Sequence, residues 1–143
     1  MPTVKDILDR KGGKVLTAPP DNTVLDATRL MNRHRVGALL VEENGRVVGV
    51  FTERDVLTRV VAMERPPDKT RVADVMTTPV AYCTPDSPLD ECRAIFTGKR
   101  IRHLPVLDGP TLVGIITSGD LLAYEFTAHE RTIRYLEEYI QTP

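Results

Sequence analysis

The chain has 143 residues, of which 41% are hydrophobic and 27% are charged. These fractions are typical of a globular protein and disfavour a disordered segment, and 19 basic against 20 acidic residues lack the basic excess of a nucleic-acid-binding protein. Because no apolar run approaches the ~20 residues that span a bilayer and residues 1–9 lack a secretory signal pattern, we expect a cytoplasmic protein without membrane contact.

The first half of the chain predicts five elements in the order strand, helix, strand, strand, helix. They are a strand at 15–17, a helix that begins at 21–23, strands at 36–41 and 47–51, and a helix at 53–63. The first strand ends at Pro19 and Pro20, because proline has no N–H for a sheet ladder. Asn44 and Gly45 between two apolar runs predict a hairpin turn, and apolar residues at helical spacing predict the helices.

The second half of the chain predicts the same five elements. They are a strand at 80–82, a helix with Ser87 as its N-cap and Pro88 in its first position, strands at 104–107 and 112–116, and a helix from 118 to about 124. Serine is a favourable N-cap, and proline is common at the first helical position. The turn at 108–110 takes the place of the earlier hairpin turn.

The two halves are copies of one unit, superposed when Pro20 falls on Pro85. Identical pairs include Arg35 and Arg100, Leu39 and Leu104, Val41 and Val106, Gly49 and Gly114, Thr52 and Thr117, and Asp55 and Asp120. Each unit is preceded by a short segment, called its leader below. The leaders at 4–8 and 72–76 also match after a short shift of the alignment. We therefore divide the chain into a first repeat at 1–63, a linker at 64–71, a second repeat at 72–124 and a C-terminal segment at 125–143.

The duplication has a physical reason, because a unit of about 60 residues buries a small fraction of its surface and is marginal alone. Its strands are apolar throughout and need cover on both faces. We expect a mixed α+β fold in which two βαββα repeats pack sheet to sheet as one pseudo-symmetric module. The linker contains Pro66, Pro67 and charged residues, which suits a crossing on the surface.

The segment at 125–143 predicts an amphipathic helix. Ile133, Leu136 and Ile140 fall at helical spacing, with mixed charges on the other face. A membrane-surface helix would carry an excess of lysine and arginine on its polar face, and this segment does not. We expect the helix to pack in a homodimer, with docking of a protein partner as the alternative.

These motifs resemble a tandem pair of CBS domains, the cystathionine-β-synthase repeat. The resemblance covers residues 4 to about 123 and is carried by the ordered double occurrence of the segments 36–41, 49–55, 72–79, 102–106 and 114–120. It implies two βαββα-like repeats with packed sheets that associate into flat dimers. It also implies adenosine ligands (AMP, ADP, ATP, NAD(H) or S-adenosylmethionine) in the two clefts between repeats, and a regulatory role without catalysis.

The segments Thr52 to Asp55 and Thr117 to Asp120 are the first candidate site. A hydroxyl residue followed three positions later by an acid is a helix N-terminal capping pattern. Capping is compatible with ligand binding, since a free helix N-terminus attracts phosphate and a carboxylate accepts ribose hydroxyls. The resemblance implies a ribose contact for both aspartates, and a hydroxyl contact for both threonines and Ser118.

Arg102 and His103 are the second candidate site. They are either an exposed basic pair at a strand start or, as the resemblance implies, phosphate ligands near the cleft. The first repeat has Gly37 and Ala38 at the equivalent positions, which allow close approach of a base but offer no charge. Arg54 adds a cation to that repeat. We therefore expect two chemically unequal clefts.

The ends of the first strands complete the candidate set. Thr17, Ala18 and Tyr82 are either plain strand ends or, as the resemblance implies, contacts to the base through backbone and apolar surface. Pro105 lies two residues after the basic pair. It is included with that pair because the first repeat has leucine at the equivalent position. Lys14 is a weaker phosphate candidate.

No pattern in the sequence predicts catalysis or a metal site. Cys83 and Cys92 lie outside any CxxC motif and are expected to be small buried hydrophobic residues in a reducing compartment. His34 and His129 have no partners at metal-ligand spacing and are expected on the surface. The motifs GxSxG, HExxH, GxxxxGK[ST] and GxGxxG are all missing, so we expect no enzyme activity and no obligatory cofactor.

Three functions follow from this sequence. The favoured one is a stand-alone sensor that binds an adenosine nucleotide and regulates an unidentified protein. The second is an interaction protein with non-functional clefts that acts through its C-terminal helix on a protein or nucleic acid. The third is a regulatory insert of a nucleotide-metabolising enzyme, which is disfavoured because the first repeat starts close to Met1 and the extension ends cleanly.

Overall fold

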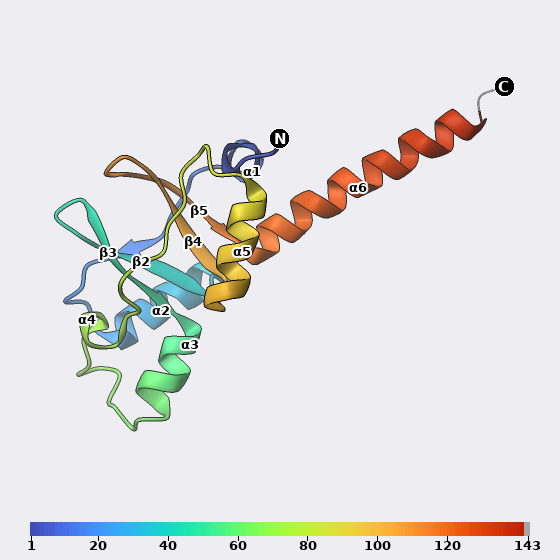
Figure 1. The fold of residues 1–143 in the computed structure, drawn as a ribbon. Helices are drawn as coiled ribbons and strands as arrows, with labels where there is room; N and C mark the ends of the chain where they lie inside the picture. Colours follow the sequence, from blue (N-terminus) through green and yellow to red (C-terminus); the bar gives the residue numbers. More distant parts are fainter. Residues whose placement is uncertain (142–143) are drawn as a thin grey trace.

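The computed structural model describes residues 1–141. The first half contains α1 (Val4–Lys11), β1 (Thr17–Ala18), α2 (Val24–His34), β2 (Ala38–Glu43), β3 (Arg46–Thr52), α3 (Glu53–Asp55) and the π-helix η1 (Val56–Val61). The second half contains α4 (Val72–Val75), α5 (Leu89–Lys99), β4 (His103–Asp108), β5 (Thr111–Thr117) and α6 (Ser118–Gln141). Figure 1 shows two small sheets with helices around them and α6 extending away from the rest.

The first repeat forms a three-stranded sheet in the order β1-β2-β3. β1 is parallel to β2, and β2 is antiparallel to β3. The predicted hairpin turn is confirmed: Asn44 and Gly45 both have positive φ, at 53° and 76°, as a tight turn between twisted strands requires. The first strand is shorter than the predicted 15–17: it begins two residues later and ends one residue later.

The second repeat forms only a two-stranded sheet, β4-β5, so the strand predicted at 80–82 is wrong. A single parallel bridge between Cys83 and Val106 stands in its place. In the first repeat, the Leu40 N–H donates to the Leu16 carbonyl at 3.0 Å and anchors the incoming strand. The equivalent residue in β4 is Pro105, which has no N–H to donate.

The helices α2 and α5 are equivalent, but they begin differently. Thr23 caps α2, and its hydroxyl accepts a hydrogen bond from the Asp26 N–H at 3.1 Å. The predicted cap Ser87 is wrong by one residue: Pro88 is the N-cap of α5. The Ser87 hydroxyl instead accepts from the Thr84 N–H at 2.9 Å, within the preceding turn.

Each leader packs in the core of the other repeat. α1 begins the first repeat in the sequence, but its Val4 and Ile7 lie in the core of the second repeat with Phe96 and Leu104. In the same way, Val72 and Val75 of α4 lie in the core of the first repeat. Each leader also forms a bridge at the start of the other repeat's first long helix, between Thr3 and Pro88 and between Thr23 and Arg71. The chain therefore crosses the boundary between the halves twice.

Besides the cores of the two repeats, a separate apolar cluster joins the two sheets. Ala38, Leu40 and Val50 of the first repeat are buried there, and Leu112 and Ile115 of β5 pack against them. The predicted α+β fold, with two repeats packed sheet to sheet, is thereby confirmed.

The ends of the two repeats depart from their predicted helices. The segment predicted as one helix at 53–63 is a single turn of α-helix, α3, followed by the π-helix η1. The segment predicted as a separate helix at 125–143 continues α6 without a break, and residues 142–143 of that prediction lie outside the described residues. No glycine or proline follows Gly119 before the end of α6, so nothing stops the helix at the edge of the module.

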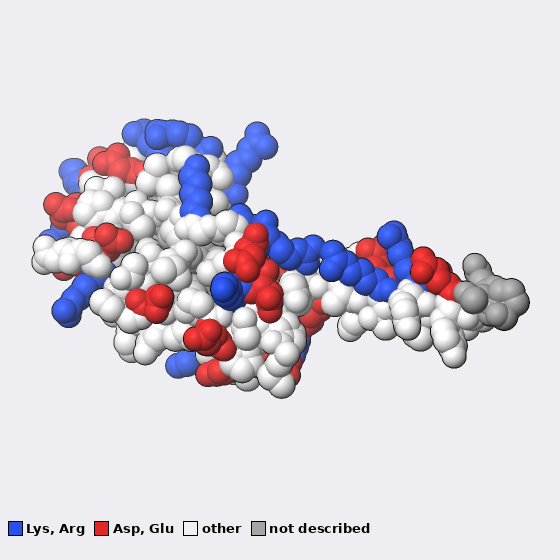
Figure 2. All heavy atoms as spheres, turned by 90° about the horizontal axis from the view of Figure 1, so that it is seen from above, with Lys and Arg blue, Asp and Glu red and all other residues white. Residues whose placement is uncertain are grey.

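Beyond the module, α6 stands clear of the other elements (Figure 1). On the face seen in Figure 2, basic and acidic side chains are interspersed over the body and along α6, with uncharged side chains along one flank of that helix. None of the helices within residues 1–141 combines the length and apolarity needed to cross a bilayer.

Candidate functional site

The candidate residues of the first repeat meet where β2 begins and β3 ends. Ala38 pairs with Thr52 across the two strands. The carbonyl of Gly37 accepts from the Glu53 N–H at 3.0 Å, and a Cβ on Gly37 would lie 3.1 Å from the Glu53 carboxylate. The small residue therefore leaves room for the start of α3 beside the strand.

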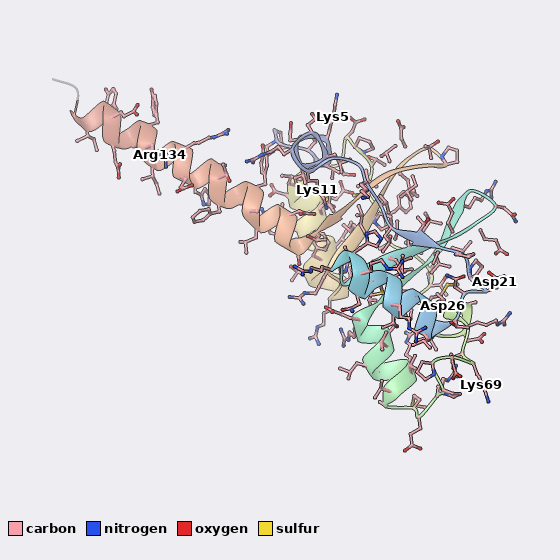
Figure 3. All side chains as sticks on the ribbon, turned by 180° about the vertical axis from the view of Figure 1, so that it is seen from behind. Lys5, Lys11, Asp21, Asp26, Lys69 and Arg134 are labelled. Atoms are coloured by element: carbon pink, nitrogen blue, oxygen red, sulfur yellow. The ribbon has the colours of Figure 1, made fainter. Side chains whose placement is uncertain are left out.

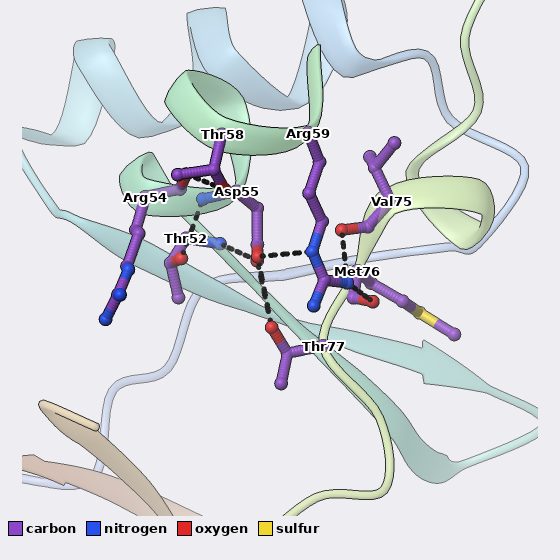
Figure 4. A network of polar contacts seen from close by, with 8 residues as sticks. All are labelled: Thr52, Arg54, Asp55, Thr58, Arg59, Val75, Met76 and Thr77. Atoms are coloured by element: carbon purple, nitrogen blue, oxygen red, sulfur yellow. Dashed lines mark hydrogen bonds and ion pairs between the residues drawn. The ribbon is translucent and has the colours of Figure 1, made fainter. Parts of the chain in front are cut away.

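Asp55 lies inside a dense polar network (Figure 4). Its Oδ2 accepts from the Thr52 N–H at 3.0 Å, and its own N–H donates to the Thr52 hydroxyl at 3.2 Å. The Thr77 hydroxyl donates to Oδ1 at 3.1 Å, and Arg59 Nε lies 3.7 Å from the same oxygen. The side chain is only 6% exposed, so both carboxylate oxygens already have partners and are shielded from solvent.

Thr77 reaches Asp55 because the second leader crosses into the first repeat. Its backbone N–H and C=O pair with Val50 of β3, at 2.8 and 3.0 Å. Arg59 reinforces the same crossing, since its guanidinium donates to the carbonyl oxygens of Val75 and Met76 at the end of α4.

The second repeat repeats this geometry with different side chains. His103 pairs with Thr117 across β4 and β5, and the Arg102 carbonyl accepts from the Ser118 N–H at 3.0 Å. Asp120 forms the equivalent capping pair: its Oδ2 accepts from the Thr117 N–H at 2.9 Å, and its N–H donates to the Thr117 hydroxyl at 3.0 Å. The predicted capping role is confirmed in both repeats.

Asp120 differs from Asp55 in its surroundings. Its outer partner is Lys11 of α1, whose Nζ lies 2.6 Å from Oδ2 and also donates to the Ile115 carbonyl at 3.0 Å. The carboxylate is 25% exposed, and within residues 1–141 no hydrogen bond to its Oδ1 is formed. Asp120 also borders a pocket of about 280 Å³ between α1 and α6.

His103 lies among charges from both halves. Burial lowers its pKa below the ordinary value of 6.5, and the cations Arg102 and Lys11 lower it further, while the carboxylates Glu53 and Asp120 oppose the shift. Glu53 belongs to the first repeat, so His103 senses charge across the boundary between the repeats. The neutral imidazole is the favoured form at neutral pH.

The remaining candidate residues are not part of the polar networks around Asp55 and Asp120. Arg54 points away from Asp55 (Figure 4), and the Tyr82 side chain is 55% exposed. Thr17 and Ala18 pair with Leu40 and Val41 farther along β2. Pro105 is buried in β4, where its carbonyl accepts from the Cys83 N–H at 3.0 Å.

Sequence reasoning missed Thr77, Arg59 and Lys11. Lys11 is the last residue of α1 and Thr77 lies just after α4, and each contacts the aspartate of the repeat to which it does not belong in sequence. Lys11 and Asp120 are 109 positions apart, so no local spacing links them. The matching leaders at 4–8 and 72–76 were a signal of the duplication, but not of the crossing.

The two cysteines are free and buried, as predicted. The pKa of the Cys83 thiol is raised by its hydrogen bond with Cys92 and by burial, so the thiol is protonated at neutral pH. His34 and His129 are exposed, also as predicted. Within the described residues, no group of three His, Cys, Asp or Glu side chains is arranged to hold a metal ion.

Comparison with known proteins identifies similar chains. The CBS-domain model matches residues 4–62 and 72–126. The CBS domain-containing protein YhcV of Bacillus subtilis is 36% identical over 121 residues, which cover 85% of this chain and 84% of YhcV.

Solved structures share the fold. A signal-transduction protein with CBS domains from Burkholderia ambifaria, described as putative, superposes with a TM-score of 0.85 at 41% identity, over 88% of this chain and 95% of that one. The CBS domain pair of protein MJ0100, solved with 5′-methylthioadenosine and S-adenosyl-L-methionine, superposes with a TM-score of 0.77 at 27% identity, over 90% and 98%. With both repeats matched by the family model and the same tandem arrangement in its neighbours, this chain belongs to the CBS-domain family as a CBS pair.

Proposed function

We propose that this protein is a non-catalytic sensor that binds an adenosine-containing ligand and transmits its presence to a protein partner. The single observation that carries the proposal is the state of Asp120. The capping pair with Thr117 holds its carboxylate, yet one carboxylate oxygen is unused and a quarter of the side chain is exposed. A carboxylate of this kind accepts hydrogen bonds from ribose hydroxyls, each contributing about 1.5–3 kcal/mol.

The similarity to MJ0100 supports the class of ligand. That CBS pair was solved with two adenosine derivatives. In this chain, Thr117, Ser118, Arg102 and His103 lie around the start of α6 and the end of β5, together with Asp120. They offer two hydroxyl groups, the Arg102 guanidinium and the neutral His103 imidazole as partners for a ribose and a phosphate.

We propose that the Asp120 site is filled first and the Asp55 site is filled weakly or not at all. A ligand at Asp55 would have to displace the Thr77 hydroxyl and expose a carboxylate that is 6% accessible. Breaking a buried polar network costs free energy that the ligand must replace. The two sites therefore differ in accessibility as well as in charge.

The test is thermal unfolding with adenosine, AMP, ADP, ATP, NAD and S-adenosylmethionine. A ligand at about 100 times its Kd stabilises by roughly 2.7 kcal/mol, which raises the Tm by roughly 5–11 °C for a chain of this size. We expect at least one compound to do so, and D120A to abolish the shift. If no compound raises the Tm, but deletion of 126–143 abolishes capture of a partner, the interaction protein is the correct function.

We also propose a homodimer through the equivalent helices η1 and α6. Leu57 and Val61 on η1 correspond to Leu122 and Phe126 on α6, and all four side chains are more than half exposed. The same apolar surface therefore occurs on both pseudo-symmetric helices. It can pack against its copy in a second chain that is related by a two-fold axis.

The dimer is tested by light scattering after size-exclusion chromatography. We expect twice the chain mass for the wild type and the chain mass for the double variant Leu57→Glu, Leu122→Glu. The variant Leu136→Glu tests the other interface, which the sequence predicted along 125–143, and should remain a dimer if η1 and the start of α6 form the contact. A dimer that survives the double variant but is lost in Leu136→Glu places the interface on the outer part of α6 and contradicts the proposal.

A further inference from the structure

We infer that Lys11 is a ligand-binding residue of the Asp120 site, with its ammonium group bound to the phosphate of an adenosine phosphate. The leader helix α1 of the first repeat would then complete the site of the second. This inference rests on the proposed function, since it names a contact of the same ligand.

The position of Lys11 is fixed by two contacts before any ligand arrives. Its Nζ lies 2.6 Å from Asp120 Oδ2 and 3.0 Å from the Ile115 carbonyl oxygen. An ammonium group has three N–H donors, so one remains free. The side chain is 30% exposed, and that third donor can therefore reach a ligand without a further loss of side-chain freedom.

The pocket beside Lys11 has the charge and the size for one end of a ligand. It is lined by Ile7, Arg10, Lys11, Asp120, Ala123, Tyr124 and Thr127. Two cations against one carboxylate favour an anionic group. Its volume of about 280 Å³ is close to the lower end of small-molecule sites, about 300 Å³, so we expect it to hold part of a nucleotide.

Arg10 supplies the second cation of this pocket. Its guanidinium lies 5.5 Å from the centroid of the Tyr124 ring, in the range of a cation–π contact. Figure 3 shows Lys5 and Lys11 on α1, with Lys11 beside the body of the second repeat and Lys5 directed outward. The helix α1 therefore presents its last turn, and not its whole length, to the site.

In the first repeat, the cation beside the aspartate is Arg59, whose Nε lies 3.7 Å from Asp55 Oδ1 and whose guanidinium also donates to the carbonyl oxygens of Val75 and Met76. Thr77 pairs with Val50, the residue that corresponds to Ile115, and gives Asp55 a neutral hydroxyl. Lys11 gives Asp120 a positive charge at the corresponding place. A phosphate beside the ribose is therefore matched at the Asp120 site, where a charge-assisted hydrogen bond is available.

The experiment compares the binding of AMP and adenosine by calorimetry in the full chain. We expect Lys11→Met to weaken AMP binding about 10- to 100-fold, the loss of a hydrogen bond to a charged group, and to change adenosine binding less than threefold. Lys11→Arg should recover most of the AMP affinity. Lys5→Met on the outward side of α1 is the matched control and should change neither. Sodium phosphate alone should bind far more weakly than AMP.

The outcomes separate this inference from the proposed function. If the wild type binds adenosine or S-adenosylmethionine but not AMP, Lys11 is not a phosphate ligand and the sensor function stands. If Lys11→Met weakens AMP and adenosine equally, Lys11 only positions Asp120, and the inference is overturned. If sodium phosphate binds as tightly as AMP, the site is a simple anion site and the inference fails. If the wild type binds no adenosine compound, both proposals fall.

Discussion

Asp55 and Asp120 show how one motif acquires two environments. Each aspartate forms the same reciprocal capping pair with a threonine three residues earlier. What differs is the outer partner, which is Thr77 with Arg59 in one repeat and Lys11 in the other. The motif therefore determines the start of a helix in both repeats, while its neighbours determine whether the carboxylate is accessible.

This difference predicts unequal stability effects. Asp55→Ala leaves the Thr52 N–H and the Thr77 hydroxyl without their buried acceptor, at a cost of about 1–3 kcal/mol. Asp120→Ala removes a more exposed cap and should cost about 0.5–2 kcal/mol. Urea unfolding at pH 7 measures both free energies. A loss in Asp120→Ala equal to or greater than that in Asp55→Ala would contradict the burial difference.

The two cysteines predict a chemical result. Cys83 and Cys92 are buried, and the raised pKa of Cys83 disfavours its reactive thiolate. We expect no reaction with a thiol-specific disulfide reagent in the folded protein over minutes. Both thiols should react in urea, and fast reaction of the native protein would show that this core opens.

Among the elements, the leader helix α1 depends on two glycines for its place. A Cβ on Gly13 would lie 2.6 Å from the carbonyl oxygen of Val113, which is backbone and cannot move aside. A Cβ on Gly114 would lie 2.8 Å from the Leu8 side chain. The leader and the segment after it can approach β5 closely only because these residues have no side chain.

This packing predicts opposite effects for two glycine substitutions. Gly13→Ala should lower the Tm, because the added methyl pushes the segment after α1 away from β5. Gly98→Ala is the matched control: it lies in α5 with nothing within 4 Å of the added Cβ, and should stabilise by roughly 0.4–1 kcal/mol. Thermal unfolding compares them, and an unchanged Tm for Gly13→Ala would mean that the close approach is dispensable.

At the scale of the whole molecule, charged groups from both repeats meet at the boundary between the repeats. Glu53 of the first repeat and Arg102, Lys11 and Asp120 act together on His103. Protonation of His103 therefore couples to charges brought together by the crossing of the leaders.

This coupling predicts a pH dependence of stability. Because the pKa of His103 is lower in the folded protein than its ordinary 6.5, the unfolded chain binds the proton more readily. Stability therefore falls as the pH drops from above 6.5 through the folded-state pKa. Between pH 7.5 and 5.0 the Tm of the wild type should fall more steeply than that of His103→Gln. The control His34→Gln, at an exposed position on α2, should follow the wild type, and parallel curves for His103→Gln would refute the prediction.

Much of the architecture could be predicted because it is local. The hairpin at Asn44 and Gly45 and the caps at Thr52 and Thr117 depend on residues within a few positions of each other. The missing strand before β4 was not predicted, because the effect of Pro105 appears only when its pairing partner is known. The candidate site was predicted as two clusters, without the partners that distinguish them.

The amino-acid order alone determined the duplication, the order of elements and the pairing of each acid with its capping threonine, since these follow from periodicity and short-range hydrogen bonding. Tertiary packing decided the exchange of α1 and α4, the shielding of Asp55 and the placing of Lys11 beside Asp120. The reason is that burial and charge at a site depend on residues that are distant in the chain and meet only when the two cores close.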